Sequence, residues 1–101
     1  MISVSIARKY AKALLRIGLK EKNHEALGRD LDKFHALLQE KKQLRGLLFN
    51  VFYRPARRKA MAREIGKFLG LNKITMDFID LLIDRERMDH FPAVVQSYRE
   101  L

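Results

Sequence analysis

The histidines are the first side chains in this 101-residue sequence that could do chemistry, because imidazole is a common metal ligand. His24 and Glu25 open a run that resembles a zinc-binding HExxH helix, but Gly28 stands where the second histidine must lie, one helical turn later. His35 and His90 have no further ligands at metal-binding spacing. The sequence therefore predicts no metal site.

Three carboxylates recur at helical spacing, namely Asp77, Asp80 and Asp84, and they share one helix face. Carboxylates grouped in this way could serve in acid–base chemistry, but an exposed acidic face has the same pattern and is the more common case. No phosphate-binding loop is present, and with no Cys the chain has no thiol nucleophile. We therefore predict no catalytic residue and no cofactor, and a protein that is not an enzyme.

The middle of the chain is strongly basic. Of the net charge of +9, residues 1–40 contribute +3, residues 41–73 contribute +9 and residues 74–101 contribute −3. Cations of this kind neutralise phosphates, and aromatic side chains nearby could stack on bases, so a nucleic-acid-binding domain is the alternative function. The cations of this cluster are Arg54, Arg57, Arg58, Lys59, Arg63 and Lys67, and the nearby aromatic residues are Phe49, Phe52 and Tyr53.

Three of these cations, Arg57, Arg58 and Lys59, fall in the first turn of an expected helix, where the helix macrodipole disfavours positive charge. An acidic partner or an anionic surface would offset that cost. No recognisable recognition helix or single-strand module accompanies the cluster, so we rank nucleic-acid binding second.

The elements that carry these residues are expected to be helices. Apolar residues recur with a period of 3.6, no segment alternates with period 2, and there is no Asn-Gly or Asp-Gly hairpin signal. We expect Ser3 or Ser5, Asn23 and Thr75 to act as N-caps, and Gly70 to end a helix. The fold class is therefore all-α, a compact six-helix bundle in a single domain, with helices over about 5–20, 23–40, 43–51, 55–69, 75–88 and 92–101.

Two of the expected helices are apolar over unusually wide arcs, about 200° for the helix at 5–20 and about 240° for the helix at 75–88. Such a helix must be covered on two sides, either because it is central in its own bundle or because part of it receives a partner. We hypothesise that the two helices lie side by side and leave an apolar groove for an amphipathic helix. Tyr10 would anchor the partner, and the small residues Ala7, Ala11, Ala13 and Gly18 would allow a close approach.

No run of apolar residues approaches the roughly 20 that a transmembrane helix needs, so no direct membrane insertion is expected. The first residues lack the apolar core and cleavage site of a secretory signal, and we take Met1 as the true start.

Three stretches carry a family resemblance. Residues 6–14 (IARKYAKAL) resemble the opening helix of the delta subunit of F-type ATP synthase, the family of the oligomycin-sensitivity-conferring protein. Residues 44–50 (LRGLLFN), followed by Pro55, resemble the family's ELxxLLxNPxxP region. Residues 78–92 (FIDLLIDRERMDHFP) resemble its FLxLLxxNxRLxxLP stretch. Their order and spacing match over essentially the whole chain.

The resemblance implies a six-helix N-terminal domain on top of the catalytic head, with the N-terminal helix of an alpha subunit bound between helices one and five. Such a domain is part of the peripheral stator, which holds the head against rotation during ATP synthesis. It would lie at the cytoplasmic face of the inner (plasma) membrane as part of the complex. The partner-binding residues implied by position are Tyr10, Ala13, Leu14, Ile17, Phe78, Leu81, Leu82 and Arg85.

The family's second segment, which contacts the peripheral stalk subunit, has no counterpart in these residues, so the resemblance assigns them no stalk contact. Two departures concern charge. Arg57, Arg58 and Lys59 occupy a stretch where relatives often carry acids, and Arg85 and Glu86 stand where Asn-Gly is common.

Overall fold

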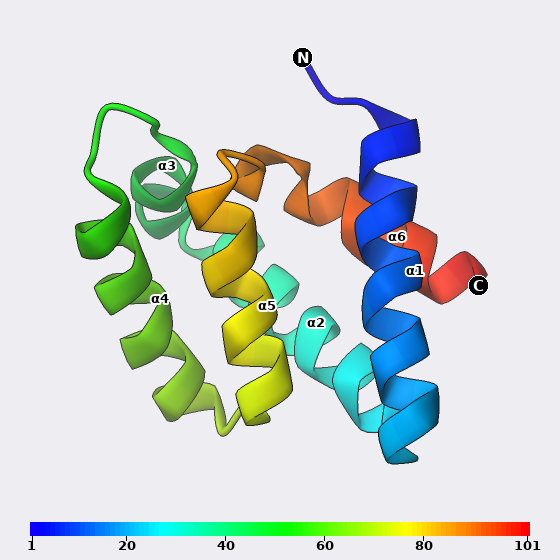
Figure 1. Ribbon diagram of the computed structural model, residues 1–101. Helices are drawn as coiled ribbons and strands as arrows, with labels where there is room; N and C mark the ends of the chain where they lie inside the picture. The colour runs from blue at the N-terminus through cyan, green and yellow to red at the C-terminus, as the bar shows by residue number, and fades with distance from the viewer.

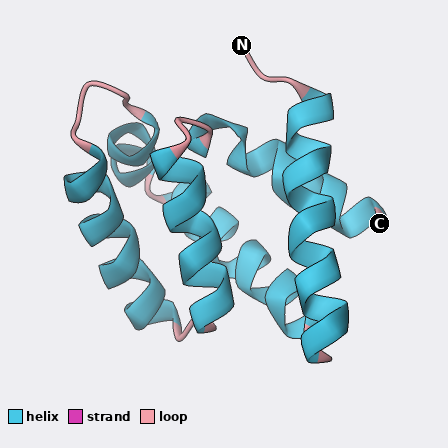
Figure 2. Cartoon of the chain, in the orientation of Figure 1, coloured by secondary structure: helices cyan, strands magenta, loops and turns pink.

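The computed structural model describes all 101 residues and contains helices and loops but no strands (Figures 1 and 2). The prediction of an all-α six-helix bundle is confirmed. A short 3₁₀ turn, η1 (Met88–His90), precedes the last helix. The six α-helices are α1 (Val4–Glu21), α2 (His24–Glu40), α3 (Lys42–Phe49), α4 (Pro55–Leu69), α5 (Lys73–Asp84) and α6 (Phe91–Glu100).

Two of the predicted caps are as expected. The Ser3 hydroxyl accepts a hydrogen bond from the Ile6 N–H at 3.2 Å and so caps α1. Gly70 ends α4 with a left-handed φ of 69°, a conformation that costs glycine little. Asn23 does precede α2, but its side chain makes no capping hydrogen bond.

The predicted start of α5 at Thr75 is wrong. The side chain of Asn72 caps the helix by accepting a hydrogen bond from the Ile74 N–H at 2.8 Å, so α5 begins at Lys73. The Thr75 hydroxyl is buried and donates instead to Asp30 on α2. The predicted end at Met88 is also wrong, because the chain leaves the helix after Asp84 and adopts a left-handed φ of 55° at Glu86.

The prediction that α3 reaches Val51 is likewise corrected, because the helix ends at Phe49. The Asn50 side chain accepts a hydrogen bond from the Phe52 N–H at 2.9 Å, and this local turn competes with continuation of the helix.

Helix α2 occupies the centre of the bundle and packs against all five other α-helices. In Figure 1, α4, α5 and α1 run side by side across the front, with α2 and α6 behind them. Helix α1 packs mainly on α6 and α2, whereas α5 packs mainly on α4. At the core, the rings of Phe34 and Phe91 meet edge to face with centroids 5.4 Å apart. Helices α1 and α5 therefore pack mainly on different helices, although both contact α2.

The crossing of α1 and α2 depends on Gly18. A Cβ atom at this position would lie 2.7 Å from the Cα atom of His24 and 2.8 Å from its Cβ atom. Because a backbone atom cannot move aside cheaply, we expect Gly18→Ala to destabilise the domain by about 1–3 kcal/mol, although alanine favours a helix by about 1 kcal/mol.

Urea unfolding would measure this change. The matched control is Gly46→Ala in α3, where an added Cβ meets nothing within 4 Å, so that the helix propensity of alanine should raise stability. If both substitutions changed the free energy of unfolding equally, the close approach of α1 to α2 at Gly18 would be contradicted.

Candidate functional site

A surface hollow of about 380 Å³ lies between α1 and the end of α5. Its α1 side is formed by one stripe of side chains at helical spacing, and its other side by Leu81 and the turn that follows α5. Leu81, in the last turn of α5, is 39% exposed. The lining residues are Ile6, Lys9, Tyr10, Ala13, Leu81, Arg85 and Arg87.

The floor of the hollow is held by an aromatic contact between the two helices. The rings of Tyr10 and Phe78 meet edge to face, with centroids 6.4 Å apart and an interplanar angle of 69°. Phe78 is only 7% exposed, whereas Tyr10 is half-buried, so the tyrosine spans the distance from core to surface. This ring pair is a direct contact between α1 and α5, which otherwise pack mainly on different helices.

The structure divides the eight predicted site residues into three groups. Tyr10, Ala13, Leu81 and Arg85 line the hollow, and Phe78 lies beneath it. Ile17 is 45% exposed on α1 but does not line the hollow. Leu14 and Leu82 are fully buried in the core and present no surface to a partner.

Sequence reasoning missed three lining residues, Ile6, Lys9 and Arg87. Ile6 and Lys9 each lie four residues before a predicted member, Tyr10 and Ala13, so the helical period itself was the available signal. Arg87 had no such signal, because its place depends on the turn after α5.

Three ion pairs join α4 to α5 and to the turn that follows it. Arg63 contacts Asp80 at 2.7 Å, Lys59 contacts Asp84 at 2.9 Å, and Arg58 contacts Glu86 at 2.7 Å. The acid expected to offset the cations in the first turn of α4 is therefore internal to the chain. The acidic face of α5 is engaged in the same pairs, and Asp77 pairs with Lys73 at 2.8 Å.

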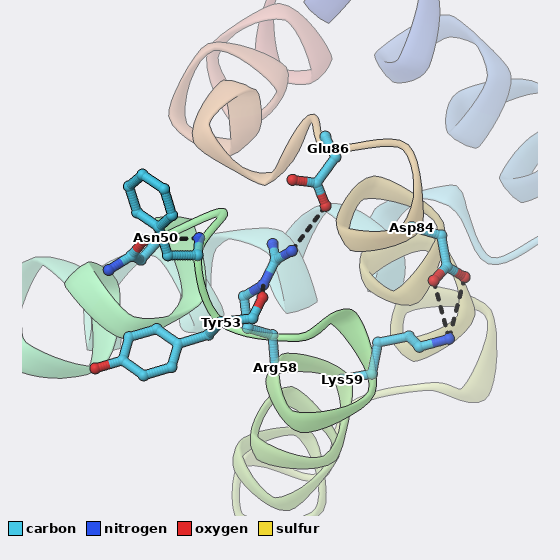
Figure 3. Close-up of polar contacts among 7 residues, drawn as sticks. Asn50, Tyr53, Arg58, Lys59, Asp84 and Glu86 are labelled. Carbon is cyan, nitrogen blue, oxygen red and sulfur yellow. Dashed lines mark hydrogen bonds and ion pairs between the residues drawn. The ribbon is translucent and has the colours of Figure 1, made fainter.

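Arg58 is the best buried of these charges, since only 2% of it is exposed. Its Nε atom donates to the carbonyl oxygen of Tyr53 at 2.9 Å, while its Nη2 atom donates to Glu86 (Figure 3). The guanidinium thus ties the α3–α4 loop to the turn that carries Arg85 and Arg87. Glu86, whose side chain accepts this hydrogen bond, is also the residue with the left-handed backbone conformation.

The same pairs weaken the nucleic-acid interpretation. They neutralise Arg58, Lys59 and Arg63, half of the predicted basic cluster. Of the aromatic residues, Phe49 packs partly against the core, whereas Phe52 is 93% exposed. Phe49 is therefore less available for stacking than Phe52.

A second hollow, of about 570 Å³, lies on another side of the molecule between α1, α2 and α6. Burial raises the pKa of Tyr98 in its wall, and the tyrosine hydroxyl donates to the carbonyl oxygen of His24. An ion pair of Arg99 with Asp32 at 2.8 Å crosses its rim. It contains none of the predicted site residues.

No three His, Asp or Glu side chains gather as a metal site would require. None of the helices has the length and apolar character to cross a membrane. The structure is an all-helical domain with an open hollow between α1 and the end of α5.

Comparison with known proteins identifies the family. The profile of the ATP synthase delta (OSCP) subunit matches residues 6–101, and the chain belongs to that family. It is 33% identical over 98 residues to ATP synthase subunit delta of Geobacter metallireducens, covering 97% of this chain and 54% of the relative. The corresponding protein of Syntrophobacter fumaroxidans is 34% identical over 101 residues, which are 100% of this chain and 55% of the relative.

A more distant relative is the chloroplastic ATP synthase delta chain of Chlamydomonas reinhardtii, with 25% identity over 96 residues, 95% of this chain and 44% of the relative. The chain thus spans about half the length of the curated relatives it matches.

Proposed function

We propose that this domain is a non-catalytic stator component of a proton-translocating F-type ATP synthase and binds the N-terminal helix of an alpha subunit between α1 and α5. Family membership supports the assignment to the complex. The observation that carries the binding proposal is the hollow where α1 faces the exposed Leu81 of α5. In this role the domain lies at the cytoplasmic face of the membrane as a peripheral part of the complex.

The side chains of the hollow suit a docked amphipathic helix. Ile6, Tyr10 and Leu81 offer apolar surface, and the small Ala13 leaves room for a close approach of a partner backbone. The Tyr10–Phe78 contact holds the Tyr10 ring against α5 before binding. A preorganised surface loses little conformational entropy on binding. This favours the tight binding that a stator domain needs to hold its partner under torque.

Calorimetric titration with the N-terminal peptide of the cognate alpha subunit tests the proposal. We expect Leu81→Asp to weaken binding at least about 100-fold, because it removes the apolar contact of Leu81 and places a hydrated charge against the apolar stripe of the peptide. The variant should stay folded because Leu81 is already partly exposed, and circular dichroism checks this.

Leu19→Asp is the matched control, since Leu19 is 55% exposed on α1 and lines the second hollow instead. If Leu19→Asp abolished binding and Leu81→Asp bound normally, the binding site would be assigned to the second hollow instead. Absence of binding to the unmodified domain would contradict the proposal.

A further inference from the structure

The rim of the hollow between α1 and α5 is positively charged. Lys9 on α1 and Arg85 and Arg87 on the turn after α5 line it together with Leu81. Lys9 and Arg85 are exposed, and Arg87 is partly exposed. None of the three takes part in an ion pair within the domain.

The carboxylates closest in the sequence to Arg85 and Arg87 are all engaged elsewhere. Asp84 pairs with Lys59 and Glu86 with Arg58, both on α4, while Asp89 contacts the buried His90. Figure 3 shows the first two pairs, which turn the acids of this segment towards α4. Arg85 and Arg87 alternate with these acids along the chain and are left without a partner at the hollow.

The position of the two arginines is also held by the fold. The Arg85 and Arg87 N–H groups donate to the carbonyl oxygens of Leu81 and Leu82, at 2.9 and 2.7 Å. The left-handed Glu86 between them is fastened to the buried Arg58. The cations are therefore presented by a fixed turn instead of a mobile loop.

From this charge arrangement we infer that the occupant of the hollow is an amphipathic helix with carboxylates beside its apolar stripe, at the end that lies against Arg85 and Arg87. The inference rests on the proposed function and adds to it the chemistry of the partner. Docking would bring each carboxylate beside an unpaired guanidinium or ammonium group in a partly dehydrated contact, where charge pairs are stronger than in water. A helix with cations at the same positions would be rejected, which makes Arg85 and Arg87 specificity-determining residues.

The test compares charge reversals inside and outside the hollow, using the N-terminal peptide of the cognate alpha subunit as the probe. In low salt we expect the double variant Arg85→Glu with Arg87→Glu to bind the peptide roughly 30-fold more weakly than the unmodified domain, with a smaller dependence on salt. The control is Lys12→Glu with Lys67→Glu, which changes the net charge equally at exposed positions that do not line the hollow.

A second arm changes the peptide. A version with its Asp and Glu residues replaced by Lys is expected to bind the unmodified domain weakly and to regain affinity for the Arg85→Glu, Arg87→Glu variant. Circular dichroism and urea unfolding confirm that each variant is folded.

The outcomes separate this inference from the proposed function. In one outcome the peptide binds the unmodified domain and loses affinity for Leu81→Asp, but the charge reversals inside and outside the hollow weaken binding equally. That outcome would support the hollow as the binding site and overturn the inference that the partner is acidic. A Lys-substituted peptide that binds as tightly as the parent would also overturn it. Failure of the parent peptide to bind the unmodified domain would contradict the proposed function itself, and the inference with it.

Discussion

Arg58→Ala is expected to destabilise the domain by about 3–5 kcal/mol, the largest effect of any substitution considered. Arg58 is one of the largest fully buried side chains, and its removal leaves a cavity. It also breaks two hydrogen bonds from a charged donor, to the Tyr53 carbonyl and to Glu86, each contributing about 1.5–3 kcal/mol. Urea unfolding monitored by circular dichroism measures the loss.

The matched control is Arg63→Ala, which removes a pair of the same length from the same helix. The Arg63 side chain is 54% exposed, so its pair with Asp80 should contribute no more than about 1 kcal/mol. Equal costs for the two substitutions would refute a special role for the buried guanidinium.

A double-mutant cycle with Glu86→Gly isolates the pair. Glycine at this position relieves the left-handed backbone, a gain of about 1 kcal/mol, but it removes the carboxylate from a buried cation. We therefore expect Glu86→Gly to be destabilising when Arg58 is present and close to neutral or stabilising when Arg58 has been replaced. Additive effects would show that the two side chains are not coupled.

Asp30→Ala is expected to cost about 2–4 kcal/mol. This carboxylate on α2 is 6% exposed and accepts two hydrogen bonds, from the Asn72 N–H at 2.9 Å and from the Thr75 hydroxyl at 2.8 Å. Both donors lie at the N-terminal end of α5, Asn72 as its N-cap and Thr75 in its first turn, where a negative charge also complements the macrodipole. Without Asp30, the fully buried Thr75 hydroxyl has no partner.

Thermal or urea unfolding measures this change, with Asp32→Ala as the control. The Asp32 side chain is 49% exposed and pairs with Arg99 at the surface, so its loss should lie within about 1 kcal/mol. Replacing both Asp30 and Thr75 by apolar residues, Asp30→Leu with Thr75→Val, should recover part of the stability, because no polar group is then left unpaired. If the double variant recovered no stability, the loss in Asp30→Ala would be due to packing and not to an unpaired polar group.

The sequence by itself determined the features that depend on neighbours within a turn or two. The 3.6-residue period predicted six helices, and the local chemistry of Ser3 and Gly70 correctly located two of their ends. The wide apolar arcs predicted that α1 and α5 need cover on two sides. The structure packs α1 on both α6 and α2, whereas α5 packs mainly on α4. The three family motifs were sufficient to indicate the family to which the chain belongs.

The tertiary structure decided whatever depends on residues far apart in the chain. Periodicity gives the angle of a side chain around its own helix but not the neighbour it meets, so it could not separate the buried Leu14 and Leu82 from the partly exposed Leu81. Thr75 is a residue type that can cap a helix, but its hydroxyl donates a hydrogen bond to Asp30, 45 residues away in the sequence.

The same reason explains the charges. The basic middle of the sequence suggested an external anion, but Glu86 lies 28 residues from Arg58, and Asp84 lies 25 residues from Lys59. Only the packing of α4 against α5 brings these groups together, and it thereby leaves Arg85 and Arg87 as the unpaired charges at the hollow.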